Sequence, residues 1–125
     1  MSVASRPSSS DDYKADYWRR RATQLAIALE SLRQRVSSVQ VITEDIQTMW
    51  GTSFTNTQEW KDLCQRGRTA TIAARAQRSR VRKFAYEDRD TLRINSALAA
   101  ACPDNHKQQL QEVVDYLRML EAMGY

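Results

Sequence analysis

Apolar side chains recur every three and four residues from Ala15 to Trp50, with no glycine or proline between them. Thr43 is the one polar residue in this repeat, whose positions are Ala15, Trp18, Ala22, Leu25, Leu29, Leu32, Val36, Val39, Thr43, Ile46 and Trp50. Because a helix turns about 100° per residue, this spacing places the side chains on one narrow stripe. The pattern predicts a helix from about Asp11 to Met49 or Trp50, ended by Gly51, and the stripe requires a partner helix.

A second helical pattern begins near Thr57 and runs to Cys102 without proline, interrupted by one glycine, Gly67. Its inward positions combine small and bulky residues: Trp60, Leu63, Gly67, Ala70, Ala74, Gln77, Val81, Phe84 and, more loosely, Leu92, Ile94, Leu98 and Ala101. Asn56 and Glu59 have the spacing of a capping box at the start of this helix. Since the connection to the first helix is short, the two helices are expected to be antiparallel.

Charged residues at positions 87–90 interrupt the second pattern. The sequence leaves open whether this helix is continuous through residues 86–91 or is kinked there. Asp88 and Asp90 are the residues that would cap a separate helix in the second case.

A third helix is predicted after Pro103, capped by Asp104 and ending at about Ala122, before Gly124. Its apolar stripe consists of Leu110, Val113, Val114, Leu117, Leu120 and Met123. At 1.5 Å per residue, a helix of about 20 residues covers only half of the preceding hairpin. The far end of the hairpin is therefore expected to keep apolar surface uncovered near Trp50, Phe54 and Trp60.

Composition agrees with an all-α protein, since the 125 residues include only 3 glycines and 2 prolines. The predicted fold is a long antiparallel helical hairpin, coiled-coil-like, with a shorter third helix, in a three- to four-helix bundle. Residues 1–10 are rich in serine and are predicted to be a disordered tail. Residues 11–125 are predicted to form a single helical bundle domain.

Several features predict a soluble, intracellular and cytoplasmic protein. Two cysteines, Cys64 and Cys102, are too few for a disulfide framework. The first residues lack the apolar segment of a secretory signal, and no apolar run has the roughly 18 residues needed to span a bilayer. The sequence leaves open whether the chain is a fragment of a longer protein.

The net charge is +4, and basic residues concentrate in the second predicted helix. Between Asp62 and Glu87 there are no acidic residues, and four arginines share one helical sector: Arg68, Arg75, Arg78 and Arg82. We call these four residues the basic row. Three interpretations remain open: a solvated face paired with acids such as Glu30, Glu44 and Asp45, a contact for an acidic protein partner, or a contact for nucleic acid or anionic lipid.

The sequence contains no catalytic pattern, and the protein is predicted not to be an enzyme and to have no small-molecule substrate. Cys102 and His106 have a ligand-like spacing, but a structural zinc site needs four ligands, so no metal or other cofactor is expected. His106, the single histidine, is expected to be an exposed residue in the first turn of the last helix.

The expected function is a non-enzymatic protein-protein interaction module, an adaptor or subunit of a larger assembly. The predicted contacts are the basic row and the apolar hairpin end with Trp50, Phe54 and Trp60. The partner would be a protein with an acidic or apolar helical surface, or a second copy of the chain. The alternative is electrostatic binding of nucleic acid or an anionic membrane through the basic row. No motif assigns the chain to a known family.

Overall fold

The computed structural model describes residues 9–125, apart from the side chains of residues 9–11 and 54. The helices are α1 (Ser9–Met49), the 3-10 helix η2 (Ser53–Asn56), α2 (Gln58–Ile94), α3 (Ser96–Ala101) and α4 (Asp104–Ala122). The predicted all-α fold is confirmed. Most of the predicted serine-rich tail, residues 1–8, lies outside the described residues, and its last two residues belong to α1.

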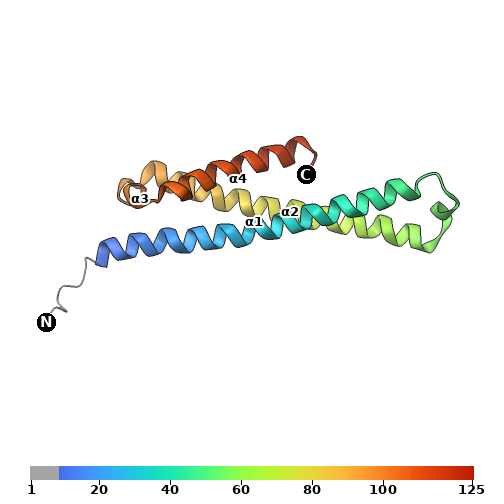
Figure 1. Ribbon diagram of the computed structural model, residues 1–125, viewed down its shortest axis with the longest axis horizontal. Helices are drawn as coiled ribbons and strands as arrows, with labels where there is room; N and C mark the ends of the chain where they lie inside the picture. Colours follow the sequence, from blue (N-terminus) through green and yellow to red (C-terminus); the bar gives the residue numbers. More distant parts are fainter. Residues whose placement is uncertain (1–8) are drawn as a thin grey trace.

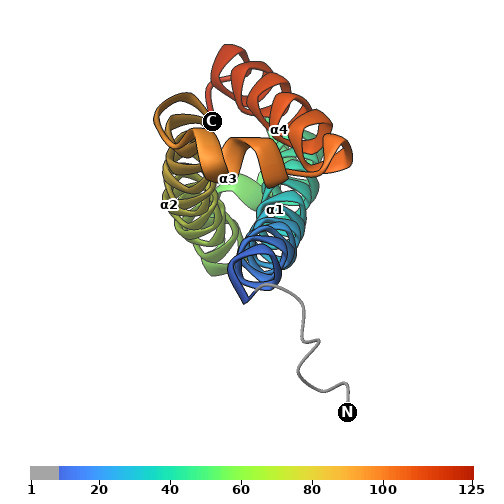
Figure 2. The same ribbon diagram turned by 90° about the vertical axis from the view of Figure 1, so that its left-hand side faces the viewer.

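The two longest helices, α1 and α2, lie antiparallel and form one elongated hairpin (Figure 1). The short helix α3 crosses the open end of the hairpin, and α4 returns over the furrow between α1 and α2 (Figure 2). Because α4 has 19 residues and α1 has 41, α4 ends beside the middle of the hairpin, and the far end consists of two helices. None of the described helices is long and apolar enough to cross a membrane.

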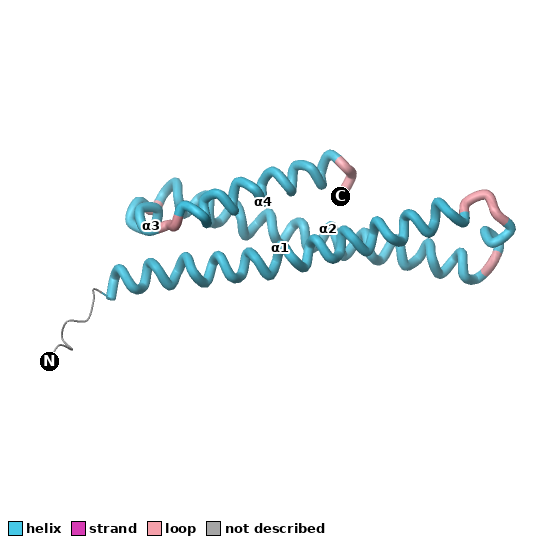
Figure 3. The backbone as a smooth tube through the Cα atoms, viewed as in Figure 1, coloured by secondary structure: helices cyan, strands magenta, loops and turns pink. Residues whose placement is uncertain are grey.

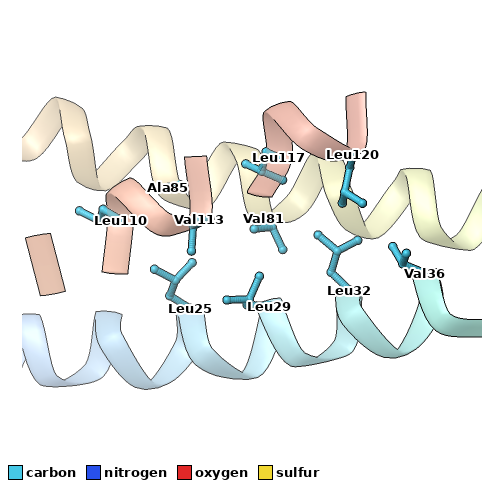
Figure 4. Close-up of a cluster of buried hydrophobic side chains, with 10 residues drawn as sticks. All are labelled: Leu25, Leu29, Leu32, Val36, Val81, Ala85, Leu110, Val113, Leu117 and Leu120. Carbon is cyan, nitrogen blue, oxygen red and sulfur yellow. The ribbon is translucent and has the colours of Figure 1, made fainter. Parts of the chain in front are cut away.

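The core lies where α1, α2 and α4 meet (Figure 4). Its buried members are Leu25, Leu29, Leu32 and Val36 of α1, Val81 and Ala85 of α2, and Leu110, Val113, Leu117 and Leu120 of α4. Each fully buried leucine contributes about 1.5–3 kcal/mol, so this cluster is the main source of cohesion between the three helices.

The predicted stripe of α1 is correct over its central turns and wrong at both ends. Ala15 is exposed, and Ile42 is buried in place of Thr43. A straight helix repeats every 3.6 residues, so a strict seven-residue repeat drifts by about 20° per heptad. After Val39 the drift brings Ile42 to the inward face and leaves Thr43 exposed.

The loops of the described chain are short and join consecutive helices (Figure 3). Gly51 has a φ of +79°, the left-handed conformation predicted for the residue after α1. The predicted capping box is wrong, because Asn56 lies in η2 and Thr57 caps α2. The Thr57 hydroxyl oxygen accepts a hydrogen bond from the backbone N–H of Trp60 at 3.2 Å.

The helix α2 is continuous through residues 86–91, so neither Asp88 nor Asp90 begins a new helix. The break lies at Asn95, whose side chain caps α3 by accepting from the N–H of Leu98 at 3.1 Å. Ile94 was predicted to face inward but is exposed, because α2 ends there. At the start of α4, Pro103 occupies the cap position without a side-chain hydrogen bond, and Asp104 is the first helical residue.

Candidate functional site

A cluster of charged and polar side chains is buried at the open end of the hairpin. The carboxylate of Asp88, fully buried in α2, accepts a hydrogen bond from Nε of Arg21 at 2.6 Å. Its second oxygen lies 2.9 Å from Nε2 of His106 in α4. A carboxylate only accepts hydrogen bonds, so this imidazole nitrogen is the donor. These three residues, the Asp88 cluster, connect α1, α2 and α4.

Aromatic rings enclose the Asp88 cluster. The guanidinium of Arg21 lies 3.6 Å from the ring centroid of Phe84 and donates to the Phe84 carbonyl at 3.1 Å. Trp18 packs against His106, with ring centroids 5.3 Å apart, and its indole N–H donates to the Leu98 carbonyl at 2.7 Å. The Asp88 carboxylate is thus buried with a partner for each oxygen, as buried charges in stable proteins are. The Arg21 side chain stays 19% exposed, and Nδ1 of His106 is buried without a hydrogen-bond partner among the described residues.

The prediction that His106 is exposed is wrong, since only 2% of the residue is accessible. The sequence did contain a signal for this site, because Asp88 follows Val81 by seven residues and so lies on the inward register of α2. The sequence left open whether the charged run around Asp88 interrupts the helix, and we did not assign Asp88 to the buried face. A carboxylate on a buried stripe instead indicates a basic partner on the opposite helix.

Cys102, at the junction of α3 and α4, is buried near the Asp88 cluster. Burial raises the pKa of its thiol, and the neighbouring carboxylates of Asp88 and Asp104 raise it further, against the opposing charge of Lys107. A buried, protonated thiol is a poor nucleophile. Among the described residues no group of three or more histidine, cysteine or acidic side chains is arranged to hold a metal ion.

The four arginines of the basic row make two kinds of contact: two bind the segment after α4, and two contact side chains of α2 itself. Arg75 donates to the carbonyl of Gly124 at 3.0 Å, and Arg78 donates to the carbonyl of Tyr125. These two arginines hold the segment that follows α4. Arg82 instead lies over the Tyr86 ring, at 5.1 Å from its centroid, and Arg68 donates to the side chain of Gln65.

No acidic side chain in the described part of the chain forms an ion pair with the basic row; the pairs that α2 forms involve residues 87, 88 and 90. Pairing with Glu30, Glu44 and Asp45 was one interpretation of the row, and the structure does not contain it. The charge of Arg68 therefore remains available at the surface, whereas Arg75 and Arg78 already have partners.

The three predicted aromatic contacts lie at the far end of the hairpin. Trp50 is 73% exposed, and its ring centroid is 6.0 Å from that of the half-buried Trp60. We predicted both as seam positions, but Trp50 lies beyond the end of α1, where there is no helix to cover it. The backbone of Phe54 lies in η2, and its side chain is outside the described residues.

Three grooves lie along the part of the hairpin that α4 does not cover. The first, of about 440 Å³, includes Ile42, Ala70, Ala73, Arg35 and Arg66. The second, of about 280 Å³ and nearer the hairpin turn, is lined by Asp45, Thr48, Met49, Glu59, Leu63 and Arg66. The third, of about 450 Å³, we call the distal groove. It is lined by Thr43, Ile46, Cys64, Gly67, Arg68, Thr71, Ile72 and Arg75.

The two ends of the hairpin therefore offer different chemistry. The Asp88 cluster is largely buried and suits a structural role, whereas the distal end presents exposed apolar and basic side chains. Comparisons with protein-family models, with curated proteins and with solved structures each found no match to this chain.

Proposed function

We propose that this chain is a non-enzymatic protein-interaction module, an adaptor or subunit of an assembly in the cytoplasm, and that it binds its partner through the distal end of the hairpin. The observation that carries the proposal is the length difference between the helices. The 37-residue α2 extends well beyond the 19-residue α4, which leaves a two-helix segment with open faces.

The distal surface has the composition of a protein interface. Trp50 and Ile72 are 73% and 68% exposed, and Arg68 lies between them along the hairpin. Tryptophan and arginine are enriched among residues that dominate binding energy, and charged residues typically surround an apolar centre. The proximal bundle supplies a rigid base for this surface, because its three helices share one core.

The Asp88 cluster favours the non-enzymatic interpretation. Asp88 pairs with Arg21 and His106, and the carboxylate and the imidazole are both buried. A catalytic acid, base or nucleophile must reach a bound substrate. The buried cluster is better explained as the contact that fixes α4 to the hairpin.

Affinity capture with the full chain tests the proposal, using lysate of the cells that produce it, with and without nuclease. The informative variant is Trp50→Gln, which removes an exposed ring. Its matched control is Ile27→Gln, which removes an exposed apolar side chain on the proximal half. Arg75 and Arg78 are poor choices, because their substitution would also release the end of the chain after α4.

The expected result is a stoichiometric protein partner that survives nuclease, is lost with Trp50→Gln and is retained with Ile27→Gln. Recovery that disappears with nuclease would replace the proposal with nucleic-acid binding. If light scattering instead shows a mass that rises with concentration, and Trp50→Gln abolishes this rise, the partner is a second copy of the chain.

A further inference from the structure

We propose that the distal groove binds an acidic amphipathic helix of a partner protein, laid end to end with α4. This inference rests on the proposed interaction function and specifies its site and the chemistry of its partner. The proposal rests on the position of Arg75. This residue donates to the carbonyl of Gly124, just after α4, and it also lines the distal groove.

The distal groove continues the furrow that α4 occupies. Over the proximal half, α4 packs on α1 and α2 through Leu110, Val113, Leu117 and Leu120. Beyond α4, Gly124 contacts Arg75, and the groove extends from Arg75 past Arg68 to Cys64, along the next three turns of α2 toward the hairpin turn. Figure 1 shows that α4 runs beside the first half of the hairpin only, and the distal groove lies along the second half.

At the floor of the groove, α1 and α2 approach each other closely. Gly67 has no side chain, and a Cβ built there would lie 3.3 Å from both Ile42 and Ile46. The hairpin is therefore narrow at this level. Ile46 and Ile72 supply apolar surface on either side, so an incoming helix would place an apolar stripe against them.

The rim of the groove is positively charged and therefore favours an acidic partner. Arg68 and Arg75 are the charged residues of its lining, and no carboxylate belongs to it. Guanidinium groups bind carboxylates with two parallel hydrogen bonds, so a glutamate beside the apolar stripe would pair with Arg68. Arg75 already donates to the Gly124 carbonyl and adds positive charge to the same rim. Two copies docked groove to groove would bring like charges together, and a phosphate backbone would leave Ile46 and Ile72 without an apolar partner.

The two cysteines of the chain allow occupancy of the distal groove to be measured. Cys64 is a free, half-buried thiol in the lining of the groove, and Cys102 is buried at the opposite end of the hairpin. A helix seated in the groove would cover Cys64 and slow its alkylation. Cys102 provides an internal reference, since its exposure is independent of the groove.

The experiment uses a displayed library of helical peptides about five turns long. Positions that flank a fixed apolar stripe are randomised, and the library is selected against the full chain. We expect enriched peptides to carry Asp or Glu on the flanks and to protect Cys64, but not Cys102, from alkylation. Arg68→Glu should weaken their binding by about tenfold or more, as expected for a lost and reversed ion pair.

Arg80→Glu is the charge-reversal control for Arg68→Glu. Arg80 is also exposed on α2 and donates to one glutamine, although this glutamine, Gln77, is buried whereas Gln65 is exposed. The same charge reversal there should leave binding within about twofold, because Arg80 lies away from the groove. Far-ultraviolet circular dichroism of both variants verifies that they remain folded.

Several results would overturn the proposal. These are the absence of enriched peptides, enrichment without acidic flanks, binding that leaves Cys64 alkylation unchanged, or equal effects of the two charge reversals. Protection of Cys64 by a single-stranded oligonucleotide or by phosphatidylserine vesicles, at least as strong as by the peptides, would assign the groove to phosphate ligands instead. If affinity capture finds a partner that depends on Trp50 while no peptide protects Cys64, the interaction function stands and this assignment of the groove fails.

Discussion

The proximal and distal halves of the hairpin are built from the same two helices but are sealed to different degrees. In the proximal half α4 covers the furrow, and Leu25, Leu32, Val81 and Leu120 are fully buried. In the distal half Leu63 is buried, but Ile46 and Trp60 are half-buried and Trp50 is exposed. A two-helix segment buries one face of each helix, so a third helix is needed to cover the sides.

Charged residues differ between the halves in the same way. In the proximal half Arg21 and Asp88 pair inside the protein, where an unpaired charge would be very costly. In the distal half Arg68 stays at the surface. Coverage by α4 therefore determines which residues are buried and stabilise the fold, and which stay exposed and available for a partner.

The largest effect is expected from Asp88→Ala. The substitution leaves the partly buried guanidinium of Arg21 and the ring of His106 without their shared acceptor. Because one partner of a buried pair is lost, the free energy of unfolding should fall by about 3–5 kcal/mol. Urea unfolding at neutral pH measures this free energy. Asp90→Ala is the control, since Asp90 is exposed and its ion pair among the described residues is with Arg93, and it should cost at most about 1 kcal/mol. Equal losses would show that the cluster does not stabilise the fold.

A matched pair of core truncations compares the two halves directly. Leu32→Ala removes a side chain that packs among three helices and should lower the free energy of unfolding by about 4 kcal/mol. Leu63→Ala should lower it by about 2 kcal/mol, because the two-helix segment can collapse around the smaller side chain. Both values come from denaturant unfolding. A larger loss for Leu63→Ala would contradict the view that the proximal half holds the main core.

Alkaline pH should weaken the proximal half through Cys102. Its pKa in the folded protein is raised above the ordinary value of 9.0, so folding favours the protonated thiol. The resulting stability is complete below about pH 9 and is lost as the pH rises toward the folded-state pKa, by at most about 1.4 kcal/mol per pH unit.

The measurement is the free energy of unfolding from pH 7 to pH 10.5. Cys102→Ala should make the fall with pH shallower than in the original chain. Burial also raises the pKa of Tyr116, which adds a decline of the same sign that persists in the variant. Parallel curves for the two proteins would show that the thiol is not the group responsible.

The smallest effect is expected from Trp50→Ala. Its ring is 73% exposed and contacts Trp60 in a tilted pair, so removal should change the unfolding free energy by about 0.5 kcal/mol. Trp18→Ala, which removes a buried ring, should cost several times more, about 3 kcal/mol. A large loss at Trp50 would indicate that the distal end is packed as firmly as the proximal end.

The periodic pattern predicted the helices well and the caps less well. The repeat through Leu25, Leu29 and Leu32, the glycine stop at Gly51 and the short last helix are all present as expected. The caps at Thr57 and Asn95 were missed, because several neighbouring polar residues can each cap a helix and tertiary packing selects among them.

The candidate surface was predicted only in part. Trp50 and Trp60 lie together as the hairpin geometry implied, and Arg68 remains at the surface. Arg75 and Arg78 bind carbonyl oxygens of residues more than 40 positions away, a contact that helical spacing does not reveal. The spacing of Asp88 after Val81 did indicate an inward carboxylate, but its partners were missed for the same reason, since Arg21 and His106 come from two other helices.

The sequence by itself determined the local geometry of this protein: which segments are helical, where breakers end them, and how long each stripe is. Those properties depend on residues within a few turns of one another. Only the tertiary structure decided that Asp88 and His106 are buried, that two arginines bind the end of the chain beyond α4, and that the furrow stays open beyond Arg75. Burial and ion pairing depend on which side chains meet across helices, and that is fixed when the helices pack.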